Sequence, residues 1–454
     1  MLRLAGTTLV VGLGKSGLSA VRALKALGAT VAVTDSRANP PGLSALRETF
    51  PEVPCYLGGF DPVAFSNAAR LLVSPGVAIA TPIIADTAAR GVPVWGDIEL
   101  LARLTAVPVA AITGSNGKST VTTLLGLMAE RAGVRAAVGG NLGEPALDLW
   151  LHAEAKSGDA PKLPELYVLE LSSFQLETTQ CLNARVATVL NISPDHMDRY
   201  RSLDEYIAAK RRIFQGDGVM VLNADDPVVM AMAESNRNIL RFTLEQPGEG
   251  EFGLWRDGGE TWLAHGQERW IEASELQISG DHNLANALAA LAMGHTLGWH
   301  REAMRAALRG FTGLAHRTTL VLEQAGIRWF DDSKGTNVGA TVAAVRGLPG
   351  SVVLIAGGDG KGQDFTPLRA ALVGKARAVV LIGRDAPLIA AALGESVPLH
   401  AVADMEQAVT RAAQLAQPGD SVLLSPACAS YDMFSGYEER GTVFAAAVRS
   451  LVAW

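Results

Sequence analysis

The feature that most constrains this chain is a glycine loop, TGSNGKST, which lies between an apolar strand and a helical pattern. Backbone N–H groups of such a loop, together with the dipole of the following helix, can hold phosphates. Lys118 can neutralise phosphate charge, and Ser119 or Thr120 can bind Mg²⁺. The common spacing of phosphate loops would require glycine where this chain has Ile112, so the loop departs from that pattern. The segment predicts a nucleoside triphosphate site.

A second glycine loop lies near the N-terminus. The β-rich run Thr7–Val11 precedes Gly-Leu-Gly-Lys-Ser-Gly, a helical pattern follows, and a further strand ends at Asp35. This βαβ unit can hold a nucleotide diphosphate, with Asp35 accepting from a ribose hydroxyl. Taken alone, the same pattern also suits NAD binding or simple helix–strand packing. Ser74-Pro-Gly76 follows another apolar run and is either a ligand loop at a strand end or only a turn.

Length and composition favour about three α/β domains, since the chain has 454 residues and domains average roughly 150. The net charge of −7 disfavours a nucleic-acid partner. The apolar run at the N-terminus is broken by glycines without a cleavage pattern, and no stretch of about 18 apolar residues predicts a membrane span. The cysteines fit neither a disulfide framework nor a zinc site, and they lie far apart at Cys55, Cys181 and Cys428. We expect a cytoplasmic protein.

Polar side chains also gather after other predicted strands of the middle segment. Glu170 ends an apolar strand and can reach a metal beside the phosphate loop, because parallel strands end on one edge of a sheet. Asp195, His196 and Arg199 cluster after the next strand, which favours a metal or substrate role over a lone structural histidine. Lys210, on a helical pattern, would by itself be a solvated lysine.

Two asparagines, Asn283 and Asn286, lie three residues apart at the start of a helical pattern. Asp281 or Asn283 is a candidate cap of that helix. Alternatively, the two amides can recognise adenine, because an amide offers both a donor and an acceptor.

The third segment repeats the alternation of strands and polar loops. The loops are DDSKGTN at 331–337, GGDGKG at 357–362 and SPACASYD at 425–432. Lys361, Ser430 and the loop N–H groups are suited to bind a small acidic substrate. Cys428 has no identifiable base beside it, so we interpret it as a structural residue. The stretches 154–165 and 245–259 are predicted to be surface excursions of the middle segment.

Together these segments resemble the Mur ligase family, from the first glycine loop to Arg440-Gly-Thr-Val-Phe444. TGSNGKST resembles the phosphate loop of that family, ELSSFQLE its metal-binding strand end, DHMDRY its histidine loop and GDHNLANALAA its adenine-binding helix. DSKGTN, GGDGKGQDF and SPACASYDMF resemble the branch that adds D-glutamate. Two positions depart from the family pattern: Ser115 replaces a common threonine, which we expect to be harmless, and Tyr437 replaces a frequent phenylalanine in the amino-acid pocket.

The resemblance implies a role for each matching residue. Catalytic roles fall on Lys118, Glu170, His196 and Lys210. ATP is bound by Gly114, Ser115, Asn116, Gly117, Lys118, Ser119, Thr120, Asn283, Asn286, Arg317 and Asp332. The UDP-linked substrate is contacted by Gly14, Lys15, Ser16, Asp35, Ser36, Arg37, Ser74, Gly76, Asn141 and His196. The amino acid is bound by Lys334, Thr336, Lys361, Ser430 and Tyr437. Two magnesium ions are held by Ser119, Glu170, His196 and Lys210, the last as a carbamate formed with CO₂.

The implied fold is α/β with three domains. Residues 1–96 form a Rossmann-like UDP-substrate domain, residues 97–313 a central P-loop ATPase domain, and residues 314–454 a Rossmann-like amino-acid domain. The implied activity is ATP-dependent addition of D-glutamate to UDP-N-acetylmuramoyl-L-alanine through an acyl phosphate, in a cytoplasmic monomer that binds small molecules and neither nucleic acid nor membrane. A folylpolyglutamate-type ligase is the nearest alternative, but it gives no reason for the first domain. A non-catalytic nucleotide switch or UDP-sugar-binding regulator is the alternative from another class.

Overall fold

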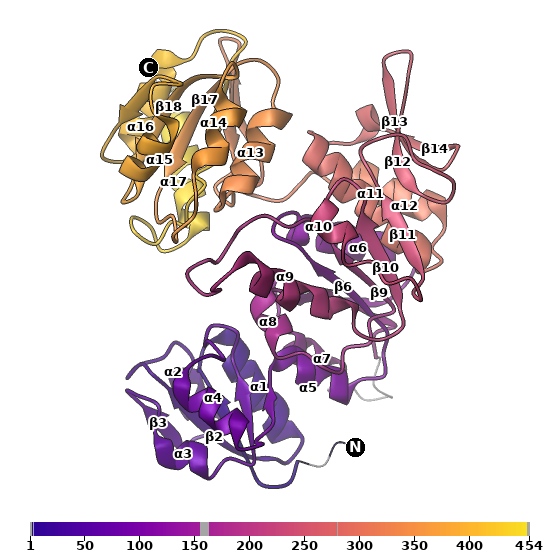
Figure 1. The fold of residues 1–454 in the computed structure, drawn as a ribbon, viewed down its shortest axis with the longest axis vertical. Helices are drawn as coiled ribbons and strands as arrows, with labels where there is room; N and C mark the ends of the chain where they lie inside the picture. Colours follow the sequence, from indigo (N-terminus) through magenta and orange to yellow (C-terminus); the bar gives the residue numbers. More distant parts are fainter. Residues whose placement is uncertain (1, 3, 155–162, 279, 452–454) are drawn as a thin grey trace.

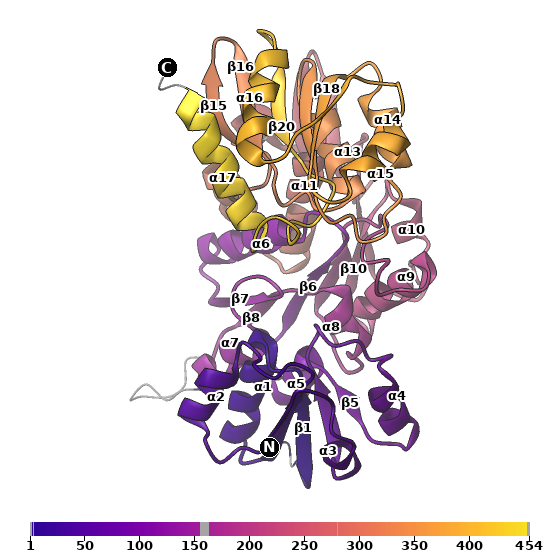
Figure 2. The same ribbon diagram turned by 90° about the vertical axis from the view of Figure 1, so that its left-hand side faces the viewer.

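The computed structural model describes residue 2 and residues 4–154, 163–278 and 280–451. It contains three sheets, each flanked by helices and stacked along the long axis of the molecule (Figure 1, Figure 2). The N-terminal sheet lies at one end, the C-terminal sheet at the other and the largest sheet between them. The predicted α/β architecture of three domains is confirmed.

The N-terminal domain is a doubly wound parallel sheet with strand order β3-β2-β1-β4-β5. Its strands are β1 (Thr7–Val11), β2 (Thr30–Asp35), β3 (Cys55–Leu57), β4 (Arg70–Val73) and β5 (Val94–Trp95). Its helices are α1 (Lys15–Ala26), α2 (Leu43–Thr49), α3 (Pro62–Ser66) and α4 (Pro82–Ala89). A Cβ at Gly17 would lie 2.0 Å from the carbonyl oxygen of Gly12, so glycine is required for α1 to pack this closely on the end of β1. The predicted βαβ unit is confirmed.

The central sheet has the order β14-β13-β12-β11-β10-β9-β6-β8-β7, with parallel pairing from β7 to β12 and antiparallel pairing from β12 to β14. Its parallel strands are β6 (Val109–Thr113), β7 (Ala136–Gly140), β8 (Leu166–Glu170), β9 (Val186–Val189), β10 (Val219–Asn223) and β11 (Ile239–Phe242). The antiparallel extension comprises β12 (Phe252–Asp257), β13 (Glu260–His265) and β14 (Glu268–Glu272). β12 lies in the stretch 245–259, so the prediction of a mere surface excursion there was wrong. The other predicted excursion, 154–165, falls mostly outside the described residues.

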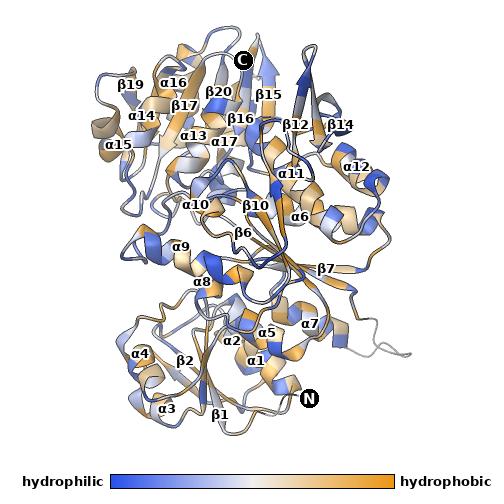
Figure 3. Cartoon of the chain, turned by 45° about the vertical axis from the view of Figure 1, so that its right-hand side comes forward, coloured by the Kyte–Doolittle hydropathy of each residue, from blue (hydrophilic) through white to orange (hydrophobic). Residues whose placement is uncertain are grey.

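Helices cover both faces of the central sheet. They are α5 (Asp97–Leu104), α6 (Lys118–Arg131), α7 (Ala146–Glu154), α8 (Ser173–Glu177), α9 (Leu203–Arg211), α10 (Pro227–Met230), α11 (Asp281–Thr296) and α12 (Arg301–Gly310), with 3₁₀ turns at Arg212–Phe214 and Ala273–Glu275. α6 and α11 pack against each other and bury mostly apolar side chains (Figure 3). Because these two helices start beside each other, the glycine loop and the paired asparagines lie near one another.

The C-terminal domain has the sheet order β15-β16-β20-β17-β18-β19, with only β15 antiparallel. Its strands are β15 (Thr319–Gln324), β16 (Ile327–Asp331), β17 (Val352–Gly357), β18 (Ala376–Ile382), β19 (Leu399–Ala401) and β20 (Ser421–Leu424). Its helices are α13 (Val338–Gly347), α14 (Thr366–Leu372), α15 (Ala386–Leu393), α16 (Met405–Leu415) and α17 (Tyr437–Ser450). The three predicted polar loops follow β16, β17 and β20, which are neighbours in this sheet.

No helix within the described residues is long and apolar enough to cross a bilayer. The exact domain limits at 96/97 and 313/314 stay predictions.

Candidate active site

Neighbouring strand ends bring the phosphate loop and its acidic partner together. β6 lies between β9 and β8 in the central sheet, and Ile112 pairs in register with Glu170. The loop after β6 therefore begins beside the carboxylate that ends β8. The loop containing His196 follows β9 on the other side. The predicted convergence of these three segments on one sheet edge is confirmed.

The phosphate loop is shaped by glycine and by the segment after β9. Gly117 has φ +83°, and a Cβ there would lie 2.2 Å from Oδ1 of Asn286, so this position requires glycine. The amide N–H of Asn116 donates to Oδ1 of Asn191 at 2.8 Å. The hydroxyl of Ser115 lies 2.9 Å from the hydroxyl of Tyr206. Serine and threonine both carry a hydroxyl at this position of the side chain. Ser115 can therefore make the same hydrogen bond to Tyr206 as the threonine that is common in the family.

Two lysines, a half-buried Lys118 and a buried Lys210, meet at one carbonyl oxygen of this loop. Nζ of Lys118 donates to the carbonyl oxygen of Gly114 at 2.9 Å, and Nζ of Lys210 donates to the same oxygen at 2.8 Å. Burial, together with the charge of Lys118, lowers the pKa of Lys210 well below its usual value. Lys210 is 1% exposed, so the interpretation of this residue as a solvated lysine was wrong. A buried amine with a lowered pKa beside a phosphate loop is a candidate reactive group.

The carboxylate of Glu170 is buried next to these lysines. Its Oε1 accepts a hydrogen bond from the side-chain amide of Asn141 at 2.7 Å. Its Oε2 is buried and has no hydrogen-bond partner among the described residues. An unpaired buried carboxylate oxygen is costly, and a bound cation would satisfy it. This observation fits the predicted magnesium site.

The donor set around Glu170 suits Mg²⁺ better than a softer metal. No three His, Cys, Asp or Glu side chains come together as a metal site within the part of the chain that the structure describes. Ser119, Glu170, His196 and Lys210 nevertheless line a single pocket. Mg²⁺ prefers few protein ligands completed by phosphate oxygens and water, and a carbamate on Lys210 would add oxygen ligands. Burial lowers the pKa of His196, and this favours the neutral imidazole, which is the form that can bind a metal ion.

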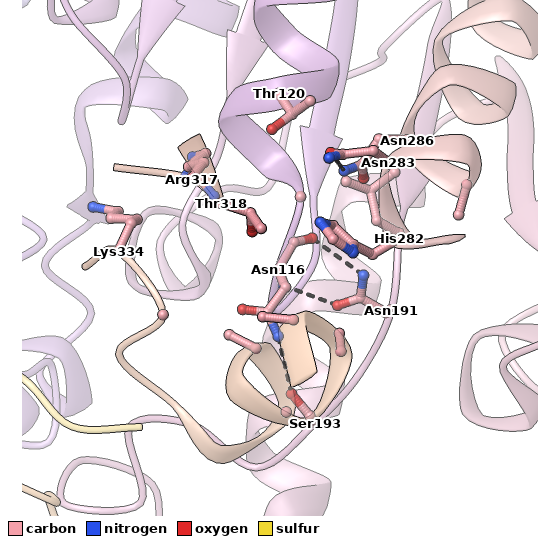
Figure 4. A pocket seen from close by; sticks show the side chains of 18 of the residues that line it. Asn116, Thr120, Asn191, Ser193, His282, Asn283, Asn286, Arg317, Thr318 and Lys334 are labelled. Carbon is pink, nitrogen blue, oxygen red and sulfur yellow. Dashed lines mark hydrogen bonds between the residues drawn. The ribbon is translucent and has the colours of Figure 1, made fainter. Parts of the chain in front are cut away.

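A nucleotide-sized pocket opens on the other side of the phosphate loop (Figure 4). Asn283 and Asn286 line it from α11, and the amide of Asn286 donates to Oδ1 of Asn283 at 3.4 Å. Asn116 and Thr120 line it from the loop, while Arg317, Thr318 and Lys334 face them across the pocket. Asp332 also lines this pocket. The cap of α11 is Gly280, so Asp281 and Asn283 do not cap this helix.

The C-terminal domain closes over this pocket through direct bonds to the central domain. Arg317 donates to the hydroxyl of Ser119 at 2.8 Å. The side-chain amides of Asn337 and Asn116 exchange hydrogen bonds of 3.1 and 3.2 Å, and Asn337 also donates to Asp195 at 3.2 Å. The C-terminal loops are consequently held against the phosphate loop.

The five residues predicted to bind the amino acid line the same pocket as Lys118 and Glu170: Lys334, Thr336, Lys361, Ser430 and Tyr437. Nζ of Lys334 lies 3.7 Å from the centre of the Tyr437 ring, a cation–π contact that phenylalanine could also make. Burial lowers the pKa of Lys334 to about 8, and nearby Arg317 and Lys118 add to this effect. Burial raises the pKa of Asp332 to about 7, although Ser425, Thr318 and Arg317 favour its charged form.

The N-terminal glycine loop forms a third pocket, lined by Gly14, Lys15, Ser16, Asp35, Ser36, Arg37, Ser74, Gly76 and Asn141. The Asp35 carboxylate accepts from the amide of Leu13 at 2.7 Å and from the amide and guanidinium of Arg37. These bonds lower its pKa to about 2 against the effect of burial. Asp35 therefore shapes the loop, and its oxygens are already occupied by protein donors.

The three pockets are continuous. Asn116, Gly117, Arg317 and Lys334 line both the nucleotide pocket and the pocket around Lys118. Asn141 lines both the latter and the N-terminal pocket. Every residue to which the family resemblance gave a role, except Gly114, lines one of the three pockets, and Gly114 supplies the carbonyl that the two lysines share. Arg199, predicted to have a metal or substrate role, lines none of them.

Several residues of this site were missed from the sequence. They are Asn191, Ser193, Tyr206, His282, Thr318 and Asn337. Most of them lie in the same polar loop as a predicted site residue, one to five positions away from it. This closeness in the sequence could have identified them. Cys428 is buried and burial raises the pKa of its thiol to about 12, which supports its interpretation as structural.

Comparison with known proteins gives consistent results over the whole chain. The family model "Mur ligase MurD-like, N-terminal domain" matches residues 6–96, "Mur ligase middle domain" residues 112–294, and "Mur ligase, glutamate ligase domain" residues 316–428. The UDP-N-acetylmuramoylalanine–D-glutamate ligase of Nitrosococcus oceani is 54% identical over 99% of this chain and 98% of its own length. The ligase of the same name from Pseudomonas aeruginosa is 52% identical over 98% of each chain.

Solved structures of similar fold include UDP-N-acetylmuramate–alanine ligase from Thermotoga maritima, with 17% identity and a TM-score of 0.59 over 98% of this chain and 100% of that one. MurF from Acinetobacter baumannii has 18% identity and a TM-score of 0.60, and the match covers 97% of this chain and 90% of MurF. These structures share the fold of this chain. The chain therefore belongs to the Mur ligase family.

Proposed function

We propose that this protein joins D-glutamate to UDP-N-acetylmuramoyl-L-alanine, at the expense of ATP, in the synthesis of peptidoglycan precursor. The observation that carries the proposal is the continuity of the three pockets, which would place a UDP-linked carboxylate, a triphosphate and an amino acid around Lys118 and Glu170. The names of relatives that share half of this sequence support the same substrates.

The reaction needs activation because a free carboxylate has no usable leaving group. A carboxylate oxygen of the alanine attacks the γ-phosphorus, the bond to the bridging oxygen breaks, and ADP leaves. Lys118, at the start of α6, offsets the repulsion between the two anions. The loop N–H groups and the α6 dipole orient the triphosphate, so catalysis of this step is mostly positioning and charge stabilisation.

Amide formation follows when the D-glutamate nitrogen attacks the acyl carbon and phosphate leaves. Lys334, Thr336, Lys361 and Ser430, which line the central pocket, are proposed to hold the two carboxylates of the amino acid through charge-assisted hydrogen bonds. The closed position of the C-terminal domain supports this step, because exclusion of water protects an acyl phosphate from hydrolysis.

Mg²⁺ would be held by Ser119, Glu170, His196 and Lys210, two ions in all, with Lys210 present as a carbamate. When bound, Mg²⁺ stabilises the charge that develops on the transferred phosphoryl group. The buried, unpaired Oε2 of Glu170 and the lowered pKa of Lys210 support this assignment, because CO₂ reacts with a neutral amine.

ATP and a nucleotide-activated sugar are metabolites of the cytoplasm, so we place the enzyme there, as a monomer that acts on small molecules without a nucleic acid or membrane partner.

The test is phosphate release by the purified protein with ATP, Mg²⁺ and UDP-N-acetylmuramoyl-L-alanine, with and without D-glutamate, and with L-glutamate and other amino acids as controls. We expect release that requires D-glutamate and a product of the corresponding dipeptide mass. Release with a different amino acid only would refute the D-glutamate assignment. No release with any amino acid would refute the ligase.

A further inference from the structure

A single arginine lies at the centre of the C-terminal loops without belonging to any pocket described above. Arg440, in the first turns of α17, is 1% exposed and is the largest fully buried side chain among the described residues. Its guanidinium donates to Oγ of Ser333 at 3.0 Å, to the carbonyl oxygen of Ser333 at 2.8 Å and to the carbonyl oxygen of Cys428 at 3.1 Å. None of the ion pairs formed by described residues includes it.

A buried guanidinium bonded only to neutral oxygens is an unusual choice for a core position. Burial lowers its pKa to about 10, so it remains charged at neutral pH. Burying such a charge is unfavourable, and an apolar side chain of similar volume would serve packing at least as well. What arginine offers here, and an apolar side chain does not, is a planar group whose several N–H donors point in fixed directions.

The bonds of Arg440 connect three segments that carry amino-acid residues of the proposed site. Ser333 precedes Lys334, and Cys428 lies two residues before Ser430. The hydroxyl of Ser333 in turn donates to the carbonyl oxygen of Tyr437 at 2.8 Å. The ring of Tyr437 covers Nζ of Lys334 at 3.7 Å. One side chain thus fixes the relative positions of Lys334, Ser430 and Tyr437.

The nucleotide side of the same loop is held by other bonds. Asp332 accepts from the hydroxyl of Ser425 at 2.7 Å and from the amide of Thr318 at 3.1 Å. Neither of these partners is bonded to Arg440. Distortion around Arg440 should consequently reach Lys334, Ser430 and Tyr437 before it reaches Asp332 and Thr318.

We infer that Arg440 is a positioning residue for the amino-acid site, which holds the loops of Lys334, Ser430 and Tyr437 in the register that D-glutamate binding requires. The inference rests on the proposed function for the location of that site. A positioning role predicts an effect on one substrate only, whereas a role in folding alone predicts loss of soluble, active protein or an equal effect on all three substrates.

The experiment compares Arg440→Lys and Arg440→Met with the wild type in steady-state kinetics for all three substrates. Lysine keeps the charge but cannot reach both carbonyls with a planar fork. For Arg440→Lys we expect a KM for D-glutamate that is raised about tenfold or more, the scale of one lost charged hydrogen bond, with the other two KM values within about twofold. Single-turnover ADP formation without an amino acid should stay within about twofold of wild type.

Arg377 provides the matched control. It pairs with Asp420 in the same domain, but at the start of β18, opposite the strand ends that carry the site. Arg377→Lys should leave all three KM values unchanged. Arg440→Met is expected to raise the KM for D-glutamate more than Arg440→Lys does. If Arg440→Met does not fold, the kinetics of Arg440→Lys alone test the inference.

Equal changes in all three KM values, or no change in the KM for D-glutamate, would overturn the inference. Wild-type turnover with another amino acid only would refute the D-glutamate assignment, and the KM for that amino acid would then test Arg440. Absence of turnover with any amino acid would overturn both proposals.

Discussion

The guanidinium of Arg317 donates a hydrogen bond of 2.8 Å to the hydroxyl of Ser119, across 198 positions of sequence. This bond places a cation from the C-terminal side over the first turn of α6, where the proposed ATP site would hold the end of the triphosphate. An arginine in that position stabilises the charge that spreads over the γ-phosphoryl oxygens.

Arg317→Met should therefore lower kcat by about 100-fold or more and raise the KM for ATP, because the lost charge acts on the transition state more than on the bound substrate. Steady-state kinetics with ATP as the varied substrate measure both constants. Arg309→Met, which removes an arginine paired with Glu275 at the end of α12, is the control and should change neither. Unchanged kcat in Arg317→Met would show that this guanidinium has no part in phosphoryl transfer.

Lys210 should carry a CO₂-derived carbamate in the active enzyme. Its amine is buried and its pKa is lowered well below the usual value, first by burial and then by the charge of Lys118, which favours the neutral form that reacts with CO₂. Wild-type protein equilibrated with ¹³C-bicarbonate should give a carbamate carbon signal in the NMR spectrum, and activity should fall in CO₂-free buffer and recover on addition of bicarbonate. Lys210→Arg should lack both the signal and the activity.

The control for this experiment is Lys375→Arg, since Lys375 donates to the carbonyl oxygen of Leu348 at a distance from the site. It should keep the ¹³C signal. A fully active enzyme without any carbamate signal would contradict the prediction.

Arg199 should control binding of the UDP-linked substrate without touching it. Its guanidinium lies 4.0 Å from the centre of the Phe174 ring, pairs with Glu177 at 2.6 Å, and donates to the carbonyl oxygen of Pro75 at 2.7 Å. It thereby ties the N-terminal loop 74–77 to the loop of His196.

Arg199→Met should raise the KM for the UDP-linked substrate about tenfold, the scale of a lost charge-assisted bond, and leave the KM for ATP within about twofold. Substrate titrations against a phosphate-release assay separate the two constants. Arg211→Met removes an exposed arginine paired with Glu234 and should have no effect. A parallel rise in both KM values would mean that Arg199 acts on overall folding instead.

The parts of this structure that the sequence predicted are those with local signals. The strand, glycine loop and helix around Lys118 follow from hydrophobic periodicity and glycine spacing, and the position of Glu170 beside that loop follows because parallel strands end on one edge. Burial of Lys210 could not be read from its helix, whose neighbouring residues are equally compatible with exposure. Only the resemblance to a family, and then the packing of α9 against the phosphate loop, revealed it.

Contacts between domains were beyond the reach of the sequence. The bonds of Asn337 with Asn116 join positions 221 residues apart, and nothing in either segment identifies the other. The same holds for Arg440, which from sequence is simply a charged residue at the start of a helix. The antiparallel strands β12 to β14 were missed because these strands carry many charged residues and are joined by glycine-containing turns, a pattern that is also typical of loops.

Binding of the acidic substrate should depend on pH through Lys334. Its pKa is lowered to about 8, first by burial and then by Arg317 and Lys118, so it loses its charge near the physiological range. A lysine is charged below its pKa and neutral above it. A dicarboxylate that pairs with the charged form should bind with constant affinity below about pH 7 and lose about tenfold in affinity for each pH unit well above the pKa.

Glutarate, a dicarboxylate without an amine, isolates this effect from ionisation of the attacking nitrogen. Its inhibition constant against D-glutamate should rise between pH 7.5 and 9.5, as expected for a group with a pKa of about 8. Tyr437, which covers Lys334, does not interfere because burial raises its pKa to about 12. In Lys334→Arg the guanidinium stays charged over this range, so the inhibition constant should be flat whatever its absolute value. A wild-type constant that is also flat to pH 9.5 would mean that the charge of Lys334 makes no contribution to carboxylate binding, and the residue would then serve only to pack against the Tyr437 ring.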